Sequence, residues 1–183
     1  MKNTIFSPLK LIVSIILLTG TYANGESASV LNAKADEAIQ KFTQKVQGGA
    51  KFLSKVKGYL VFPSVVKGGF VVGGEYGEGV LRINGQTKHY YSIASGSIGL
   101  QAGLQKTSYV IAFVSQSALE NFIKSDGWEA GVDGSITVVD LGLGKDIGSI
   151  SFEKPIYVFV FDAKGLMYNL TIEGTKFTRI TPK

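Results

Sequence analysis

The sequence GYLVFPSVVKGGFVVGGEYGEGVL, residues 58–81, decides the fold class of this chain. It holds two runs of β-branched and aromatic residues, which suit a pleated, half-buried surface. Glycines punctuate the runs, and glycine is found where strands bend or end. We therefore expect two short strands followed by a glycine cluster from Gly73 to Gly79. That cluster is a tight loop, a sharply bent strand, or a place where another group approaches the backbone, and glycine spacing leaves the three alternatives open.

A hairpin is predicted directly after this stretch. Asn84 and Gly85 suit the positive φ angles of a tight two-residue turn. The residues on either side are apolar or β-branched, as strand residues are. Residues 80–83 should therefore pair with residues 89–93.

Strands dominate the rest of the chain as well. Apolar residues alternate with polar or small ones, which is typical of a half-buried strand, over residues 97–104, 132–138 and 166–173. Between them, Ser117 and Glu120 have the spacing of a capping box, which predicts the start of a short helix.

The residues before the glycine-rich stretch have the period of a helix. Over residues 29–46, the apolar side chains fall within an arc of about 100° on a helical projection. They are Leu31, Ala35, Ala38, Ile39, Phe42 and Val46. Lysines gather on one flank of this arc, and the pattern recurs after a glycine break, where Lys51 and Lys55 flank Phe52. The lysines are the solvated border of a helix packed on the core, or a face that docks on an anionic membrane. Both can hold, because the apolar stripe can belong to the core while the lysines make the contact.

Helices at the start and strands afterwards predict an α+β, β-rich domain. Its short turns favour a curved antiparallel sheet or partial barrel with N-terminal amphipathic helices. The length of 183 residues suits a single domain.

Residues 1–23 are predicted to be a secretory signal peptide. Lys2 and Lys10 precede a short apolar run, and small residues, Thr21 and Ala23, stand where a signal peptidase would cut. The alternative is an uncleaved anchor helix, although the run is short for a membrane span. We expect residues 24–183 to be one mature domain, periplasmic or secreted. The chain has no cysteine, so disulfides, thiolate metal sites and acylation at a cysteine are excluded.

The sequence offers little for catalysis. His89 is the only histidine, and no nucleophile-elbow motif is present. Glu75 with Glu78, or Asp133 with Asp140, could in principle form a carboxylate pair. Acidic residues on strand faces are more often solvated, and neither nucleotide-binding nor metal-binding spacing occurs. We therefore expect no enzymatic activity, no cofactor, no metal and no nucleic-acid partner.

Four segments of the chain carry a family resemblance. They are KGYLVFPSVVKGGFVVGGEYGEGVL (57–81), YYSIASGSIGLQAG (90–103), GWEAGVDGSITVVD (127–140) and GLMYNLTIEGTKFTRI (165–180). In this order they resemble the bacterial branch of the lipid-binding SYLF domain family. The resemblance implies a non-enzymatic domain that binds phospholipid. In eukaryotic relatives it extends to phosphoinositides, through an N-terminal amphipathic helix, and in some to actin filaments; neither partner is expected in a bacterial envelope.

The resemblance also implies candidate lipid contacts in this sequence. The lysines expected to contact headgroups, and Phe52 as an apolar wedge, make up the set Lys41, Lys45, Lys51, Phe52, Lys55, Lys57 and Lys67. The leading hypothesis is an exported, peripheral protein that docks on anionic phospholipid membranes through a basic amphipathic helix. The alternative is an envelope protein-interaction or scaffolding domain with no lipid role.

Overall fold

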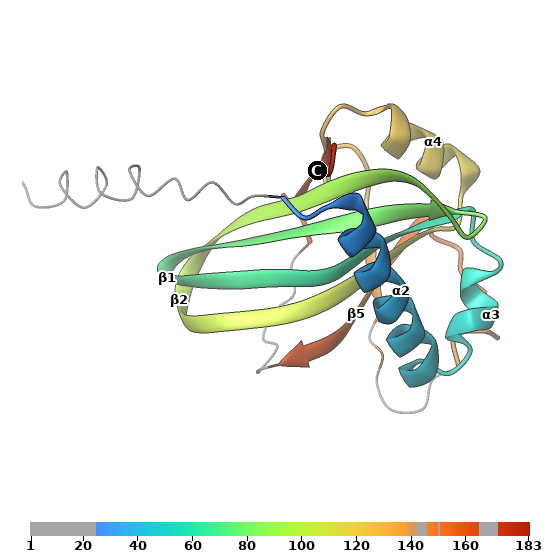
Figure 1. Ribbon diagram of the computed structural model, residues 1–183, viewed down its shortest axis with the longest axis horizontal. Coiled ribbons are helices and arrows are strands. Elements are labelled where there is room, and N and C mark those ends of the chain that lie inside the picture. The colour runs from blue at the N-terminus through green and yellow to red at the C-terminus, as the bar shows by residue number, and fades with distance from the viewer. Residues whose placement is uncertain (1–24, 140, 142–145, 150, 165–171) are drawn as a thin grey trace, which may run out of the picture.

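The computed structural model of the chain describes residues 25–139, 141, 146–149, 151–164 and 172–183 (Figure 1). The described strands form one six-stranded sheet, with the order β3-β6-β2-β5-β4 and β1 paired to β2. They are β1 (Gly58–Ile83), β2 (Gln86–Phe113), β3 (Trp128–Glu129), β4 (Thr137–Val139), β5 (Ile156–Lys164) and β6 (Lys176–Ile180). The helices are α2 (Ala28–Lys45), α3 (Gly49–Leu53) and α4 (Gln116–Lys124). This architecture confirms the predicted α+β, β-rich fold with a curved sheet and N-terminal helices.

The predicted hairpin at Asn84 and Gly85 is confirmed. Both residues have positive φ angles, 52° and 75°, which match the twist of the two flanking strands. Leu81 pairs with His89 and Val80 with Tyr90, within the expected range 89–93, whereas Arg82 pairs with Thr87 and Ile83 with Gln86, closer to the turn than expected. From this turn the antiparallel ladder continues to the pair Gly58 and Phe113 at its far end.

The long β1–β2 hairpin is folded back on itself. Register shifts occur at Phe62/Val65 and Gly69/Val71. Gly69 has φ +153°, and a Cβ placed on it would stand 2.3 Å from the Cα of Gly73. Both strands bend at the left end of Figure 1 and return toward the helices. The expectation of two short strands is therefore corrected: the two halves belong to one bent strand, because a bulge lets the ladder turn without ending.

Two glycines of the predicted cluster allow the halves of β1 to approach closely. A Cβ on Gly77 would lie 2.7 Å from the carbonyl oxygen of Ser64. A Cβ on Gly79 would lie 2.4 Å from the carbonyl oxygen of Val61 and 2.5 Å from the Phe62 ring. Of the three alternatives left open by the sequence, close approach of another backbone is therefore the one that holds at these two positions.

The helix before the sheet forms where the pattern predicts it. Ser27 is the N-cap of α2 and accepts a hydrogen bond from the backbone N–H of Val30 at 3.4 Å. Such caps satisfy a donor that the first helical turn leaves free. Gly48, with φ 79°, then turns the chain into the short α3. The observed range agrees with the predicted 29–46 to within one residue at each end.

Each face of the sheet has its own hydrophobic core. On one face, α2 and α3 pack against side chains such as Val61 and Phe159. On the other face, α4 contributes Phe122, whose ring lies 5.6 Å from that of Trp128. Because both faces are covered, the first half of β1 is almost continuously apolar instead of alternating.

Three local predictions differ from the structure. α4 has its N-cap at Ser115, whose hydroxyl accepts from the N–H of Ala118 at 3.4 Å, so the predicted cap at Ser117 is two residues late. Residues 132–138 form a turn and then only the short β4 at their end, and β4 pairs in parallel with β5. A parallel pair joins segments that are distant in sequence, so local alternation does not predict it. Of the strand predicted over 166–173, residues 166–171 lie outside the described residues.

Candidate functional site

The candidate lysines on α2 are engaged in ion pairs. Lys41 Nζ lies 2.6 Å from Glu37 Oε1 and 3.8 Å from Asp162 Oδ2, and Lys45 Nζ lies 2.5 Å from Asp162 Oδ1. The hydrogen bond with Lys41 lowers the pKa of Glu37, and the same contact raises the pKa of Lys41. These pairs are exposed and therefore weak. They nevertheless place an acidic group, Asp162 of β5, beside two of the predicted headgroup contacts.

The candidate lysines on and after α3 are less engaged. Lys51, Lys55 and Lys57 are all exposed. Lys55 Nζ donates to the carbonyl oxygen of Gly148 at 3.4 Å. Within the described ranges, no carboxylate lies within ion-pair distance of Lys51 or Lys57. Their charges are therefore available to an external anion.

Lys67 is the one candidate on the sheet. It lies on β1 next to the bend and pairs in register with Gln105 of β2. Lys106, which the sequence analysis did not select, is the next residue along β2 and pairs with Val66. The structure thus separates the candidates into three groups: two lysines on α2, three near α3, and Lys67 near the bend. Of these places, α3 and the bend lie at opposite ends of the domain (Figure 1).

Phe52, predicted to be an apolar wedge, is a core residue in the folded domain. Its side chain is 4% exposed, and its ring lies 4.4 Å from that of Phe152 and 5.2 Å from that of Phe159. This corrects the expectation of a surface wedge. The apolar stripe of α2 is buried in the same core, with Phe42 fully covered. An amphipathic pattern shows that a helix has an apolar face, but it does not show what covers that face.

A groove runs between α2 and the β1–β2 hairpin. It consists of two adjoining cavities of about 220 and 210 Å³, which share Lys34, Pro63 and Ser64 in their walls. The first also contains Lys41, Lys106 and the carboxylates of Glu37 and Asp162, and the second contains Leu31, Val66 and Tyr76. Sequence reasoning missed this groove, because its walls come from segments far apart in the chain.

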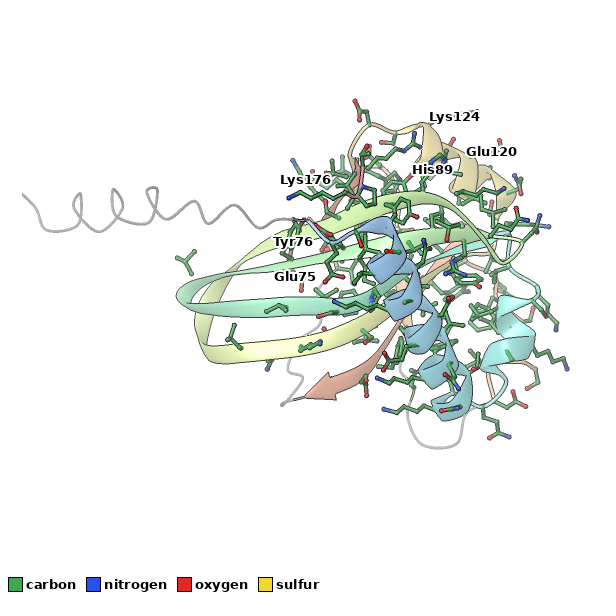
Figure 2. The ribbon with its side chains drawn as sticks, in the orientation of Figure 1. Glu75, Tyr76, His89, Glu120, Lys124 and Lys176 are labelled. Atoms are coloured by element: carbon green, nitrogen blue, oxygen red, sulfur yellow. The ribbon has the colours of Figure 1, made fainter. Side chains whose placement is uncertain are left out.

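The residues considered for catalysis do not converge. Glu75 and Glu78 point to opposite faces of β1: Glu75 is buried and accepts from Tyr109 Oη at 3.4 Å, whereas Glu78 accepts from the N–H of Glu26 on the side of α2. His89 lies beside α4, far from Glu75 (Figure 2). Asp133 accepts a hydrogen bond from the backbone N–H of Glu129, and Asp140 is outside the described residues.

Several of these groups have shifted pKa values. Burial, and then the neighbouring Glu75 carboxylate, raise the pKa of Tyr109 to about 12. Burial and the hydrogen bond to Glu78 raise that of Tyr76 to about 12. Burial, with Arg179 nearby, lowers the pKa of His89. In each case burial is the largest cause, which is usual for groups at the edge of a core.

The described residues contain neither a cluster of metal-ligating side chains nor a membrane-spanning helix. No three His, Cys, Asp or Glu side chains in these ranges gather closely enough to hold a metal ion. Of the helices that the structure describes, none has the length and hydrophobicity needed to cross a membrane.

Comparison with known proteins gives one family match. Residues 94–181 match the family model Ysc84, described as Las17-binding protein actin regulator. No curated protein matches the chain. The matched range begins within β2 and continues through β6, so it includes α4 and β3 to β6 but none of α2, α3 and β1.

Proposed function

Because this chain is a SYLF family protein, with its Ysc84 match over residues 94–181, we propose that it is a lipid-binding protein that docks peripherally on anionic phospholipid membranes. The headgroup contacts are the lysines of the α2–α3 segment and Lys67 of β1. The family match and the resemblance of the four sequence segments support lipid binding in general. The anionic specificity rests on the charges of the surface.

The observation that carries this proposal is the set of exposed lysines without a carboxylate partner in the described residues. Lys51 and Lys57 are the clearest cases. A lysine held near an anionic membrane surface contributes about 1 kcal/mol of binding free energy, and its effect falls off within a Debye length. A few such lysines are enough for reversible association at low salt, and they predict that binding weakens as salt rises.

We also propose that the protein is exported. The apolar run after Lys10 and the small residues up to Ala23 support cleavage of a signal peptide near Ala23. Expression in a bacterium, fractionation, and N-terminal sequencing of the envelope and medium fractions test this. A mature N-terminus near residue 24 is expected, and an intact N-terminus in the cytoplasm would contradict export.

Sedimentation with vesicles tests the lipid-binding function. The protein should sediment with vesicles that contain phosphatidylglycerol, and not with pure phosphatidylcholine vesicles. High salt should release it. Absence of binding under every condition would reject the proposal, and it would favour the alternative of a protein-interaction domain in the envelope.

A pair of charge-matched variants makes the test specific. The test variant reverses three candidate lysines, namely Lys51→Glu, Lys57→Glu and Lys67→Glu. The control variant makes the same change in net charge at exposed lysines elsewhere, namely Lys88→Glu, Lys124→Glu and Lys154→Glu. The test variant should lose most of its binding to anionic vesicles, while the control should keep most of it. Equal loss in both would show that only net charge matters.

A further inference from the structure

An uncovered apolar surface runs along the β1–β2 hairpin from the groove beside α2 to the bend. Four of the large exposed apolar side chains of the described residues gather here. They are Val66, Val72, Tyr76 and Leu104, and we call them the apolar strip. Val72 is 68% exposed and Leu104 is 81% exposed. Side chains this large and this exposed, when grouped, mark an interaction surface.

The four residues share one face of the hairpin. Residues separated by an even number along a strand lie on the same face. On β1, Val72 and Tyr76 are on the side of Val80, which packs in the core under α2. On β2, Leu104 is on the side of Lys106 and Ser108, which line the groove beside α2. Val66 pairs with Lys106 and lines the same groove. The apolar strip therefore continues the α2-covered face from the flank of the helix toward the bend.

The two strand segments that form the bend carry charges of one sign. No acidic residue occurs in residues 65–74 of β1 or in residues 92–108 of β2. The only charged residues in these two ranges are Lys67 and Lys106. They occupy adjacent positions of the ladder, opposite Gln105 and Val66, so they stand on opposite faces at the base of the bend. On these two strands, acidic groups begin only with Glu75, which is buried, and Glu78, which accepts a hydrogen bond from Tyr76 Oη at 2.9 Å. From neighbouring elements, Glu37 of α2 and Asp162 of β5 line the groove beside Lys106, on the side away from the bend's tip.

From these observations we propose that the bend of the β1–β2 hairpin inserts its apolar strip into the surface of an anionic lipid bilayer. Val72 and Leu104 enter the acyl boundary, and Lys67 and Lys106 lie at the level of the headgroups. Tyr76 lies at the boundary between water and lipid. Its ring is apolar, and its hydroxyl keeps its hydrogen bond to Glu78. The aliphatic stems of the two lysines allow their charges to reach the phosphates while the strip is immersed.

A bilayer fits this surface better than a second copy of the chain. In a two-fold dimer formed through the apolar strip, the Lys106 side chains of both copies would lie beside the same apolar contact. Their like charges would repel each other and disfavour the dimer. An anionic membrane instead supplies hydrocarbon for the strip and negative charge for the lysines. The occupant is therefore a lipid surface.

This inference rests on the proposed function and narrows it to one end of the molecule. The bend and α3 lie at opposite ends of the domain (Figure 1). A domain inserted by its bend stands on the membrane with Lys51 and Lys57 far from it. In this orientation Lys67 and Lys106 make the main headgroup contacts, in place of Lys51 and Lys57, which the proposed function also names. The variants below distinguish the two orientations.

Fluorescence from engineered tryptophans tests the insertion in the full protein. The probe variant is Leu104→Trp, and the control is Val132→Trp, because Val132 is similarly exposed, at 75%, but lies outside the hairpin. Native Trp128 is buried and gives a constant background in both. With phosphatidylglycerol vesicles, the Leu104→Trp emission should shift to the blue, and brominated lipid should quench it at least twofold more than the control. Equal behaviour of the two probes on vesicles that the protein does bind would overturn the inference and leave the proposed function intact.

Affinity measurements give a second, independent readout. Val72→Ser combined with Leu104→Ser should weaken binding to anionic vesicles about tenfold or more, while Val132→Ser should not. Lys67→Glu with Lys106→Glu should weaken binding more than Lys51→Glu with Lys57→Glu, and the reverse order would overturn the inference.

A blue shift of Leu104→Trp that grows with protein concentration without lipid would show self-association and overturn it too. Failure of the wild type to bind any vesicle would reject both proposals.

Discussion

Gly79 faces the carbonyl oxygen of Val61 at a distance that leaves no room for a side chain. A Cβ atom on Gly79 would stand 2.4 Å from that oxygen. The contact joins the two halves of β1 without a ladder between them, so the folded-back hairpin depends on a residue that lacks a Cβ. The bend that carries the apolar strip is positioned by this contact.

Gly79→Ala should therefore destabilise the domain. The methyl group meets backbone and the Phe62 ring, which cannot both move aside, and overpacking of this kind costs about 2–4 kcal/mol. Urea unfolding followed by circular dichroism measures the change. Gly96→Ala is the matched control, because nothing lies within 4 Å of a Cβ at Gly96. A loss below about 0.5 kcal/mol for Gly79→Ala would show that the strand halves separate easily.

Phe52→Ala distinguishes a core residue from a membrane wedge. Because the ring packs against Phe152 and Phe159, its removal should lower the free energy of unfolding by about 3–5 kcal/mol. Thermal or urea denaturation in the absence of lipid measures this. Val30→Ala on the exposed side of α2 is the control and should change little. A fully stable Phe52→Ala protein with impaired vesicle binding would restore the wedge prediction.

Asp162→Asn should strengthen binding to anionic vesicles. The substitution removes the charge that pairs with Lys41 and Lys45. Asparagine tolerates the positive φ of 58° at this position. Affinity should rise about two- to fivefold at low salt, since each lysine near a headgroup contributes about 1 kcal/mol.

The control for this change is Asp126→Asn, which alters net charge equally at an exposed residue near the end of α4. Vesicle titration at several salt concentrations compares the two. An equal rise for both variants would mean that net charge alone drives the effect, and no rise for Asp162→Asn would remove Lys41 and Lys45 from the membrane contact.

Tyr109 should contribute to loss of stability at alkaline pH. Its pKa is raised to about 12 in the folded protein, against about 10 in an unfolded chain. The folded state therefore favours the protonated phenol, and the stability this gives is complete below pH of about 10 and is lost as the pH rises toward 12. The wild type should lose up to about 3 kcal/mol through this group over that window.

Tyr109→Phe tests the assignment. The variant lacks the titrating phenol, so its unfolding free energy should decline less steeply over the same pH window. Its stability at neutral pH should be somewhat lower, because Glu75 loses the hydrogen bond from Tyr109. Identical slopes for the two proteins would assign the alkaline transition to other groups.

Two local signals in the sequence predict their local structure. The Asn84–Gly85 turn fixes the register of the hairpin because its φ angles are determined by those two residues. The α2 stripe is equally local, since Leu31, Ala35 and Phe42 recur at helical spacing. The fold class follows from the same signals, because helices precede a run of strands.

Other features depend on groups that meet only in the folded chain. The bend in β1 depends on contacts such as Gly79 with Val61, which apolar alternation does not encode. The partner of Lys45 is Asp162, separated from it by 117 positions. The sequence therefore does not show that some of the lysines beside the apolar arc of α2 form ion pairs. Phe52 was assigned to the surface for a similar reason: its covering residues, Phe152 and Phe159, come from the other end of the chain.

The ladder between β1 and β2 also sets the order in which the chain can fold. Pairing at Ile83 and Gln86 closes the shortest possible loop, whereas pairing at Gly58 and Phe113 closes the longest one in the hairpin. Formation should therefore start at the Asn84–Gly85 turn and extend outward. The helix α2 is synthesised first, yet its stripe has no complete partner surface until Val110 and Phe159 have joined Val61. The apolar stripe of α2 should therefore stay uncovered until β5 docks, and we expect this interval to be the one most exposed to aggregation.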